Sequence, residues 1–266
     1  MYFFRIMLLP FAVLPAVSIA DSLIEKGHYI AQLANCYACH TDTENNGVAF
    51  AGGRAMETEF GTFYTPNITP DKDTGIGLWK DQDFTLAVRS GLSPDGSHYY
   101  PTFPYNAYKN ITDQDITALK AYLFSLKPVK QQNKSHKLKW YMSRFSVTMW
   151  KMLNNFLQPS AKINPARGSY ILDTLGHCNE CHTPRNSLGM LQMDKRLTGN
   201  ESLSAPDISA AILKDWKTEE LTDLFSDGVL PSGDYLSDHM AEVVEFSTSH
   251  WKQPDLKAAI HYLTTQ

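Results

Sequence analysis

The five-residue motif Cys-x-x-Cys-His occurs twice in this chain of 266 residues, at positions 36–40 and 178–182, and uses all four of its cysteines. The motif is the attachment signature of c-type haem. Two thiols three positions apart can add to the two vinyl groups of one porphyrin, and the adjacent histidine then binds the iron. If the motif were a redox Cys-x-x-Cys or half of a zinc site, the histidine after the second cysteine would have to be present by coincidence in both copies. The sequence therefore predicts two covalent haem c groups, held by Cys36, Cys39, His40, Cys178, Cys181 and His182.

The sequence around the two motifs is repeated as well. The offset between matching positions stays between 137 and 142. A repeat of this length indicates a duplicated domain, not the unit of a solenoid. The matching segments are Gly27-His28-Tyr29-Ile30 with Gly168-Ser169-Tyr170-Ile171, Pro66-Asn67-Ile68-Thr69 with Pro206-Asp207-Ile208-Ser209, Trp79 with Trp216, and Gly91 with Gly228.

Each copy reads as short helices joined by long loops. Asp21 or Ser22 can cap a first helix that runs into the first motif, and 81–90 has the composition of a short helix. Thr112-x-x-Asp115 is typical of the start of a helix, which should continue to Leu126 because Pro128 follows. Two apolar stripes at helical spacing are expected to form core: Ile116, Leu119, Leu123 and Leu126, and Leu256, Ile260 and Leu263.

These patterns predict an all-α protein with two tandem helical domains, each wrapped around one haem. We expect the first domain at 21–127, a linker at 128–164 and the second domain at 165–266. Without its haem such a small domain would have a poor core, so folding and haem insertion should be linked.

The first twenty residues read as an export signal. Arg5 supplies the positive charge, residues 6–17 form a short apolar run, and Ser18-Ile19-Ala20 resembles a cleavage site. An uncleaved anchor is the alternative, although the run is short for a bilayer span. Export agrees with haem c, which bacteria attach outside the cytoplasm. We therefore expect a periplasmic protein, soluble or peripherally attached to the inner membrane.

The linker region differs in composition from both copies. From Lys127 to Arg167 there are nine Lys and Arg and no Asp or Glu. An apolar stripe recurs within it at helical spacing: Met142, Phe145, Met149, Met152, Leu153 and Phe156. One interpretation is a linker helix whose apolar face packs across both haem domains. The other is a basic amphipathic element at 127–167 that docks a partner or makes peripheral contact with an anionic membrane.

A haem that only shuttles electrons usually has a sixth ligand from the protein. Met240, 58 residues after His182, is the candidate in the second copy, since Met190 and Met193 lie too close to the motif. The first copy is less settled, because offset 137 places Phe103 opposite Met240 and phenylalanine cannot bind iron. His98 follows His40 by the same 58 residues, Met56 is another candidate, and an open iron is the third possibility.

The motifs together resemble a known group, the multihaem cytochrome c subunits of membrane-associated alcohol, gluconate, and aldehyde or nicotinate dehydrogenases. The resemblance covers nearly the whole sequence after the export signal. The segments that carry it are Gly52-Gly53-Arg54-Ala55-Met56, Phe60-Gly61-Thr62, Pro66-Asn67-Ile68-Thr69-Pro70-Asp71, Thr74-Gly75-Ile76-Gly77-x-Trp79, Tyr100-Pro101-Thr102-Phe103-Pro104-Tyr105, Leu175-Gly176-His177-Cys178, Cys181-His182-Thr183-Pro184-Arg185-Asn186 and Met240-Ala241-Glu242-Val243-Val244.

The resemblance implies a class I cytochrome c fold and a role in electron transfer. Such subunits accept electrons from a flavin-, quinohaem- or molybdenum-containing catalytic subunit and pass them to quinone or an oxidase. They commonly carry three haem motifs and a C-terminal membrane-binding helix, whereas this sequence has two motifs, and many carry Met where Phe103 stands.

The leading hypothesis is thus an electron-transfer protein without catalytic activity of its own, partnered by a dehydrogenase catalytic subunit and by a quinone- or oxidase-side acceptor. A dihaem enzyme of the peroxidase kind is the main alternative, because Phe103 could leave the first iron open. A Cys-ligated thiosulfate-oxidising haem would need a fifth cysteine, and the sequence has four. A third possibility is a docked subunit of a terminal oxidase. The formal charge of −4 argues against nucleic acid as a partner.

Overall fold

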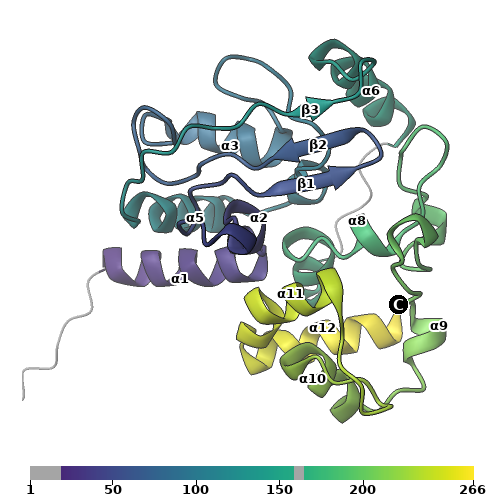
Figure 1. The fold of residues 1–266 in the computed structure, drawn as a ribbon. Coiled ribbons are helices and arrows are strands. Elements are labelled where there is room, and N and C mark those ends of the chain that lie inside the picture. The colour runs from purple at the N-terminus through teal and green to yellow at the C-terminus, as the bar shows by residue number, and fades with distance from the viewer. Residues whose placement is uncertain (1–18, 159–164) are drawn as a thin grey trace, which may run out of the picture.

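The computed structural model describes residues 19–158 and 165–266, and helices dominate them, as the sequence predicts (Figure 1). The N-terminal half contains α1 (Ile19–Leu33), α2 (Cys36–His40), α3 (Asp81–Ser90), α4 (Tyr105–Tyr108) and α5 (Asp113–Ser125). The C-terminal half contains α7 (Arg167–Ser169), a π-helical turn η2 (Tyr170–Leu175), α8 (Asn179–His182), α9 (Ala210–Leu213), α10 (Thr218–Asp227), α11 (Asp238–Phe246) and α12 (Gln253–Thr265). Between them lies α6 (Arg144–Leu157), and short 3₁₀ turns occupy Thr43–Asn45, Met193–Lys195, Glu201–Leu203 and Thr248–His250.

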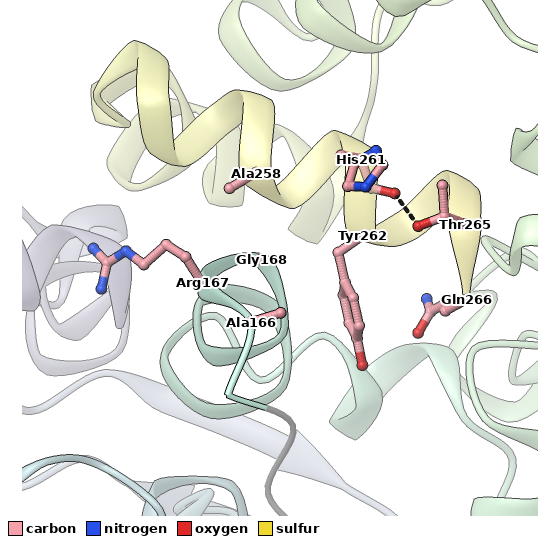
Figure 2. Close-up of a pocket in the computed structure, with 8 residues that line it drawn as sticks. All are labelled: Ala166, Arg167, Gly168, Ala258, His261, Tyr262, Thr265 and Gln266. Atoms are coloured by element: carbon pink, nitrogen blue, oxygen red, sulfur yellow. Dashed lines mark hydrogen bonds between the residues drawn. The ribbon is translucent and has the colours of Figure 1, made fainter.

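In each half, the first helix crosses the last one at a glycine. A Cβ atom on Gly27 would lie 1.9 Å from the carbonyl oxygen of Ala118, and one on Gly168 would lie 2.1 Å from that of Ala258. Figure 2 shows the second crossing, where Gly168 of α7 faces Ala258 and Tyr262 of α12 beside a shallow pocket. Only glycine lets the two backbones approach this closely, which explains why the Gly-x-Tyr segment is present in both copies.

Most of the predicted helices are confirmed. The Thr112 Oγ1 atom accepts a hydrogen bond from the Asp115 amide at 3.1 Å and so caps α5, and α3 spans the expected residues. The expected core stripes of α5 and α12 are buried, apart from the partly buried Leu126. The chain is already helical at Ile19, so Asp21 lies in the first turn of α1 and not at its cap. The predicted export signal lies, for residues 1–18, outside the described part of the chain.

The expectation of an all-α protein is wrong in one place. Strands β1 (Ala55–Thr58) and β2 (Gly61–Tyr64) form an antiparallel hairpin, and β3 (Lys137–Leu138) pairs with β2. Gly61 makes this sheet possible, since its φ of +120° is available to glycine and a Cβ there would lie 2.3 Å from the Lys137 carbonyl oxygen.

The linker helix α6 is present, but its orientation is the reverse of the packed interpretation. Val147, Lys151 and Asn154 face the protein and are buried. Of the predicted apolar stripe, Met142 packs against the small core around Phe63, Tyr100 and Val147, whereas the other five members are exposed. Carbonyl groups explain the reversal: the Lys151 ammonium donates to the carbonyl oxygens of Ser90 and Gly91 at the end of α3. Among the described residues, no helix combines the length and the apolar character that a bilayer span requires.

The two halves meet through contacts that are reciprocal. The Tyr29 hydroxyl donates to the Asp255 carboxylate at 2.8 Å, and the Tyr170 hydroxyl donates to the Asp115 carboxylate at 2.6 Å. Tyr29 and Tyr170 are equivalent in the repeat, and so are Asp115 and Asp255. Reciprocal contacts of this kind are typical of an interface between two copies related by a twofold axis.

Further contacts of the same two pairs repeat the symmetry. The backbone amide of Lys252 donates to the Tyr29 hydroxyl at 2.9 Å, and that of Thr112 donates to the Tyr170 hydroxyl at 3.2 Å. Each aspartate also pairs with a cation of its own half, Asp115 with Lys26 at 2.7 Å and Asp255 with Arg167 at 2.6 Å. Tyr29 thus joins α1 to the start of α12, and Tyr170, directly after α7, joins the C-terminal half to the start of α5.

Candidate functional site

The first Cys-x-x-Cys-His motif forms the single helical turn α2. Asn35, directly before it, has left-handed backbone angles (φ 50°, ψ 36°), so the chain leaves α1 abruptly and begins a new turn at Cys36. The thiols of Cys36 and Cys39 are free, and their spacing of three places them on one face of that turn. Burial raises the pKa of Cys36 to about 12 and also raises that of Cys39.

The second motif repeats this local structure. His177 takes the place of Asn35 and also has a positive φ, 42°. The thiols of Cys178 and Cys181 are free, and burial raises the pKa of Cys178 to about 12. Within residues 19–158 and 165–266, no three His, Cys, Asp or Glu side chains are grouped so as to hold a metal ion by themselves.

The histidine that ends each motif is oriented by a proline carbonyl. His40 Nδ1 lies 2.9 Å from the Pro66 oxygen, and His182 Nδ1 lies 2.8 Å from the Pro206 oxygen. A carbonyl can only accept, so Nδ1 carries the proton and Nε2 keeps its lone pair for a metal. Burial lowers the pKa of both imidazoles, against the opposite effect of these hydrogen bonds, which favours the neutral form that binds iron.

The role of these prolines was missed from the sequence, although the signal was present. In the sequence, the Pro-Asn-Ile-Thr and Pro-Asp-Ile-Ser segments mark the repeat, and the first is also part of the family resemblance. Because the acceptor is a backbone carbonyl, no side-chain motif announces it. The recurrence of both segments at the same offset was the only clue.

The helix α11, which carries Met240, contacts the first motif. Arg54 donates to the Ala38 carbonyl of α2 and, through its other terminal nitrogen, to the Glu242 carboxylate of α11, both at 2.6 Å. Beside this link, the rings of Tyr37 and Phe246 lie 5.0 Å apart. Met240, the predicted ligand of the second haem, therefore lies in a helix that packs on α2, the turn formed by the first motif. The single helical turn of each Cys-x-x-Cys-His motif is called its attachment turn below.

A second contact joins the two motifs directly. Tyr108, whose hydroxyl donates to the Ala34 carbonyl just before the first motif at 3.0 Å, places its ring edge-to-face with His177 at 5.7 Å. His177 directly precedes the second motif, and burial lowers its pKa to about 4. Both attachment turns thus border the junction between the halves.

The two candidate distal segments share one register. A backbone bridge pairs Leu92 with His98 in the first half and Val229 with Tyr235 in the second, again at offset 137. The structure therefore places His98 at the equivalent of Tyr235. The last hydrogen bonds that both halves share are those from the Tyr99 amide to the Gly91 oxygen and from the Leu236 amide to the Gly228 oxygen. Continued by four residues, the same offset makes Phe103 the equivalent of Met240, in agreement with the sequence comparison.

The other candidate ligands of the first haem have neighbours of their own. His98 Nδ1 lies 3.0 Å from the Lys151 ammonium, where burial and this positive charge lower the pKa of His98. Met56 lies on β1 and packs against the cluster formed by Phe63, Tyr100 and Val147. The ligand roles of His98, Met56 and Met240 stay predictions.

The residues present fit a covalent haem in each half. Each motif offers two free thiols on one turn and an imidazole with its Nδ1 already engaged. In addition, Tyr105 is only 2% exposed, and its buried hydroxyl has no hydrogen-bond partner among the described residues. A buried unpaired hydroxyl is costly unless a further polar group lies against it.

Comparison with known proteins agrees with this chemistry. Residues 24–127 match the family model for Cytochrome c. A dihaem c-type cytochrome from Cereibacter sphaeroides is 36% identical over 250 residues, which cover 90% of this chain and 84% of that protein.

Two dehydrogenase subunits are also similar. A subunit of nicotinate dehydrogenase from Pseudomonas putida is 37% identical over 258 residues, 92% of this chain and 21% of that protein. The cytochrome c subunit of a quinone-dependent alcohol dehydrogenase from Gluconobacter oxydans is 35% identical over 263 residues, 91% of this chain and 54% of that subunit. The chain thus spans only part of the length of these two relatives.

Proposed function

Because this chain belongs to the c-type cytochrome family, whose members hold haem c covalently, we propose that it is a dihaem electron carrier of the periplasm. In this role it receives electrons from the catalytic subunit of a dehydrogenase and delivers them to a quinone- or oxidase-side acceptor. The observation that carries the proposal is the duplicated attachment turn, with each histidine fixed by an equivalent proline carbonyl at 2.9 and 2.8 Å.

Each half supplies its own attachment residues. Cys36 and Cys39 would hold one haem and Cys178 and Cys181 the other, with His40 and His182 as the proximal iron ligands. When bound, the iron of a haem cycles between the ferric and ferrous states and carries one electron. The Pro66 and Pro206 carbonyls orient the imidazoles, and burial keeps these imidazoles neutral.

The contacts between the halves support passage of electrons within one chain. Both attachment turns border the junction, and the Arg54–Glu242 pair and the Tyr108–His177 ring contact hold them there. The reciprocal tyrosines keep the two halves in one arrangement. A fixed junction maintains the distance between the two redox centres, which a flexible linker would not.

The partner is inferred from the relatives. Proteins named as cytochrome subunits of alcohol, gluconate and fructose dehydrogenases share 34 to 36% identity with this chain. A dehydrogenase partner therefore accounts for the similarity.

The test is a haem count on the purified protein by the pyridine haemochrome method. Two haems per chain are expected, and one after either Cys36→Ser/Cys39→Ser or Cys178→Ser/Cys181→Ser. A wild-type protein that binds a single haem, or none, would contradict the dihaem proposal.

The ligand of the second haem has its own test. Met240→Leu should abolish the far-red absorption band of a methionine–ferric iron bond and lower the reduction potential of that haem, because methionine ligation raises the potential. Met193→Leu, at an exposed methionine nearer the motif, is the matched control and should leave the band unchanged. Because Met56 could give such a band from the first haem, both variants are made in the Cys36→Ser/Cys39→Ser background. A band that survives there in the Met240 variant rules this ligand out.

One observation favours a second candidate function. Phe103 is the equivalent of Met240 in the repeat, so the first haem could lack a methionine ligand and accept peroxide. A low-spin ferric spectrum of both haems, unchanged by cyanide or peroxide, would exclude this activity and favour His98 or Met56 as the sixth ligand. A high-spin fraction that binds cyanide would support it.

A further inference from the structure

The helix α6 exposes its apolar side and buries its polar side. Phe145, Met149, Met152 and Phe156 recur at spacings of four, three and four residues along one face, and 75%, 51%, 63% and 81% of their surface is exposed. The opposite face presents Lys151 and other buried residues to the protein. Soluble helices usually show the reverse, and apolar residues gathered in one exposed patch mark an interaction site.

This orientation is held by specific contacts on both halves of the protein. Lys151 is tied to the end of α3, in the N-terminal half. The indole nitrogen of Trp150 donates to the Leu188 carbonyl at 2.7 Å, and Gln158 donates to the Leu191 carbonyl at 2.5 Å, both in the C-terminal half. The helix therefore cannot roll its apolar face inward without losing all of these hydrogen bonds.

Aromatic and cationic side chains are exposed in the segment directly before α6. Trp140 is 94% exposed, and its ring lies edge-to-face with that of the exposed Tyr141 at 5.8 Å. Lys137 and Lys139 are exposed beside them, and in the described part of the chain neither has an acidic partner within 4.0 Å. Tryptophan and tyrosine prefer the boundary between water and hydrocarbon, and lysines beside them can reach anionic headgroups.

The charge of the segment sets it apart from the rest of the chain. The nine Lys and Arg of residues 127–167 are accompanied by no Asp or Glu. Since the chain has 24 basic and 28 acidic side chains in total, its remaining residues carry 15 basic and 28 acidic ones. The apolar face therefore lies within the positive part of an otherwise negative protein.

We propose that the outward face of α6, with Trp140 and Tyr141, binds an anionic phospholipid membrane, the helix lying in the plane of the headgroups. Specific protein interfaces mix both signs of charge and hydrogen-bonding groups around their apolar centre. A segment whose own charges are all positive and an exposed apolar stripe instead match a bilayer, which offers anionic headgroups above hydrocarbon. This surface is independent of the haem count, so either proposal can fail without the other.

The test is sedimentation of the full-length holoprotein with vesicles of phosphatidylglycerol and phosphatidylethanolamine, followed by its haem absorbance. The wild type is expected to sediment at low salt, and far less with phosphatidylcholine vesicles or at high salt. The variant Phe145→Ser/Met149→Ser/Phe156→Ser should lower the partition coefficient by about tenfold or more, because it removes three large apolar groups from the contact. These side chains are exposed, so folding should be preserved.

Two controls define the result. Leu78→Ser/Leu203→Ser/Ile212→Ser removes three similarly exposed apolar side chains elsewhere and should bind as the wild type does. Lys137→Gln/Lys139→Gln should weaken binding at low salt and reduce its salt dependence. All variants keep the same N-terminus, verified by mass spectrometry, so that any contribution of residues 1–18 is equal in all of them.

Three outcomes would overturn the proposal. Wild-type protein that stays in the supernatant with anionic vesicles shows no membrane affinity. An α6 variant that sediments like the wild type places the affinity elsewhere on the chain. A concentration-dependent dimer in the absence of lipid, abolished by the α6 variant, assigns this face to a second copy of the protein.

Discussion

The two histidines of the motifs show how single residues prepare the candidate site. Their identity follows from the sequence, whereas their usable nitrogen depends on Pro66 and Pro206, whose carbonyls engage Nδ1. A histidine without such an acceptor could adopt either tautomer. The same interaction occurs in both halves, so the repeat includes the orientation of this histidine as well as its presence.

A first prediction concerns the glycines of the helix crossings. Gly27→Ala should lower the free energy of unfolding by about 3 kcal/mol, because the new Cβ would lie 1.9 Å from the rigid Ala118 carbonyl oxygen. Gly168→Ala should cost a similar amount at the Ala258 carbonyl. Denaturant unfolding of the holoprotein measures both.

The control for this prediction is Gly96→Ala. No atom lies within 4 Å of a Cβ at Gly96, whose φ is +84°, so only backbone strain of about 1 kcal/mol is expected there. If Gly27→Ala and Gly96→Ala cost the same, the close helix approach is not what requires glycine at position 27.

At the scale of elements, the helices with caps and apolar stripes could be predicted, since both signals are local. The α3 and α5 helices occur where the sequence places them. The hairpin of β1 and β2 was missed because its strands have only four residues each and depend on β3, more than 70 residues away in the sequence.

The helix α6 illustrates a different limit. Its period of apolar residues predicts a helix with two unlike faces, but periodicity does not tell which face points inward. In the structure the face with Lys151 points inward, because its ammonium donates to the carbonyl oxygens of Ser90 and Gly91 at the end of α3. An apolar stripe is therefore evidence that a helix forms an interface, but it does not identify the partner of that interface.

A second prediction concerns the tyrosines that join the halves. Tyr29→Phe and Tyr170→Phe should each lower the free energy of unfolding by about 1 to 2 kcal/mol, because each removes a hydrogen bond to a carboxylate and leaves a backbone amide unpaired. In the double variant, calorimetry should show the halves unfolding less cooperatively, with the transition broadened or split.

Tyr262→Phe is the matched control for these variants. It breaks a tyrosine–aspartate hydrogen bond of 2.9 Å, to Asp173, that lies within the C-terminal half. It should lower stability without broadening the transition. If it splits the transition as the double variant does, the reciprocal tyrosines have no special role in joining the halves.

At the scale of the whole molecule, duplication is visible in the sequence but the arrangement of the copies is not. The constant offset of matching segments predicts two similar units. Their reciprocal packing depends on Tyr29 and Tyr170, each of which reaches the other half. In a sequence, a residue that is repeated because it contacts the other unit cannot be distinguished from one that is repeated because it packs in the core of its own unit. Charge acts at this scale too, since the linker region is positive while the remainder of the chain is negative.

The last prediction uses His177, which lies where both halves and both motifs meet. Its pKa in the folded protein is lowered by burial to about 4, whereas an unfolded histidine titrates near about 6.5. As the pH falls through this interval, the unfolded chain takes up a proton that the folded protein refuses. His177 should therefore lower the free energy of unfolding between about pH 6.5 and pH 4, by on the order of 3 kcal/mol.

His177→Asn tests this directly. Asparagine tolerates the positive φ of 42° and occupies the equivalent place before the first motif, as Asn35 with φ 50°. The variant should show a smaller decrease in stability over this interval, because it lacks the contribution of His177, whereas His250→Asn, at an exposed histidine, should show the full decrease. Denaturant unfolding at a series of pH values gives the slope for each protein. If the wild type and His177→Asn have the same slope, His177 is accessible to protons in the folded protein, and the junction between the halves is more open to water than its packing indicates.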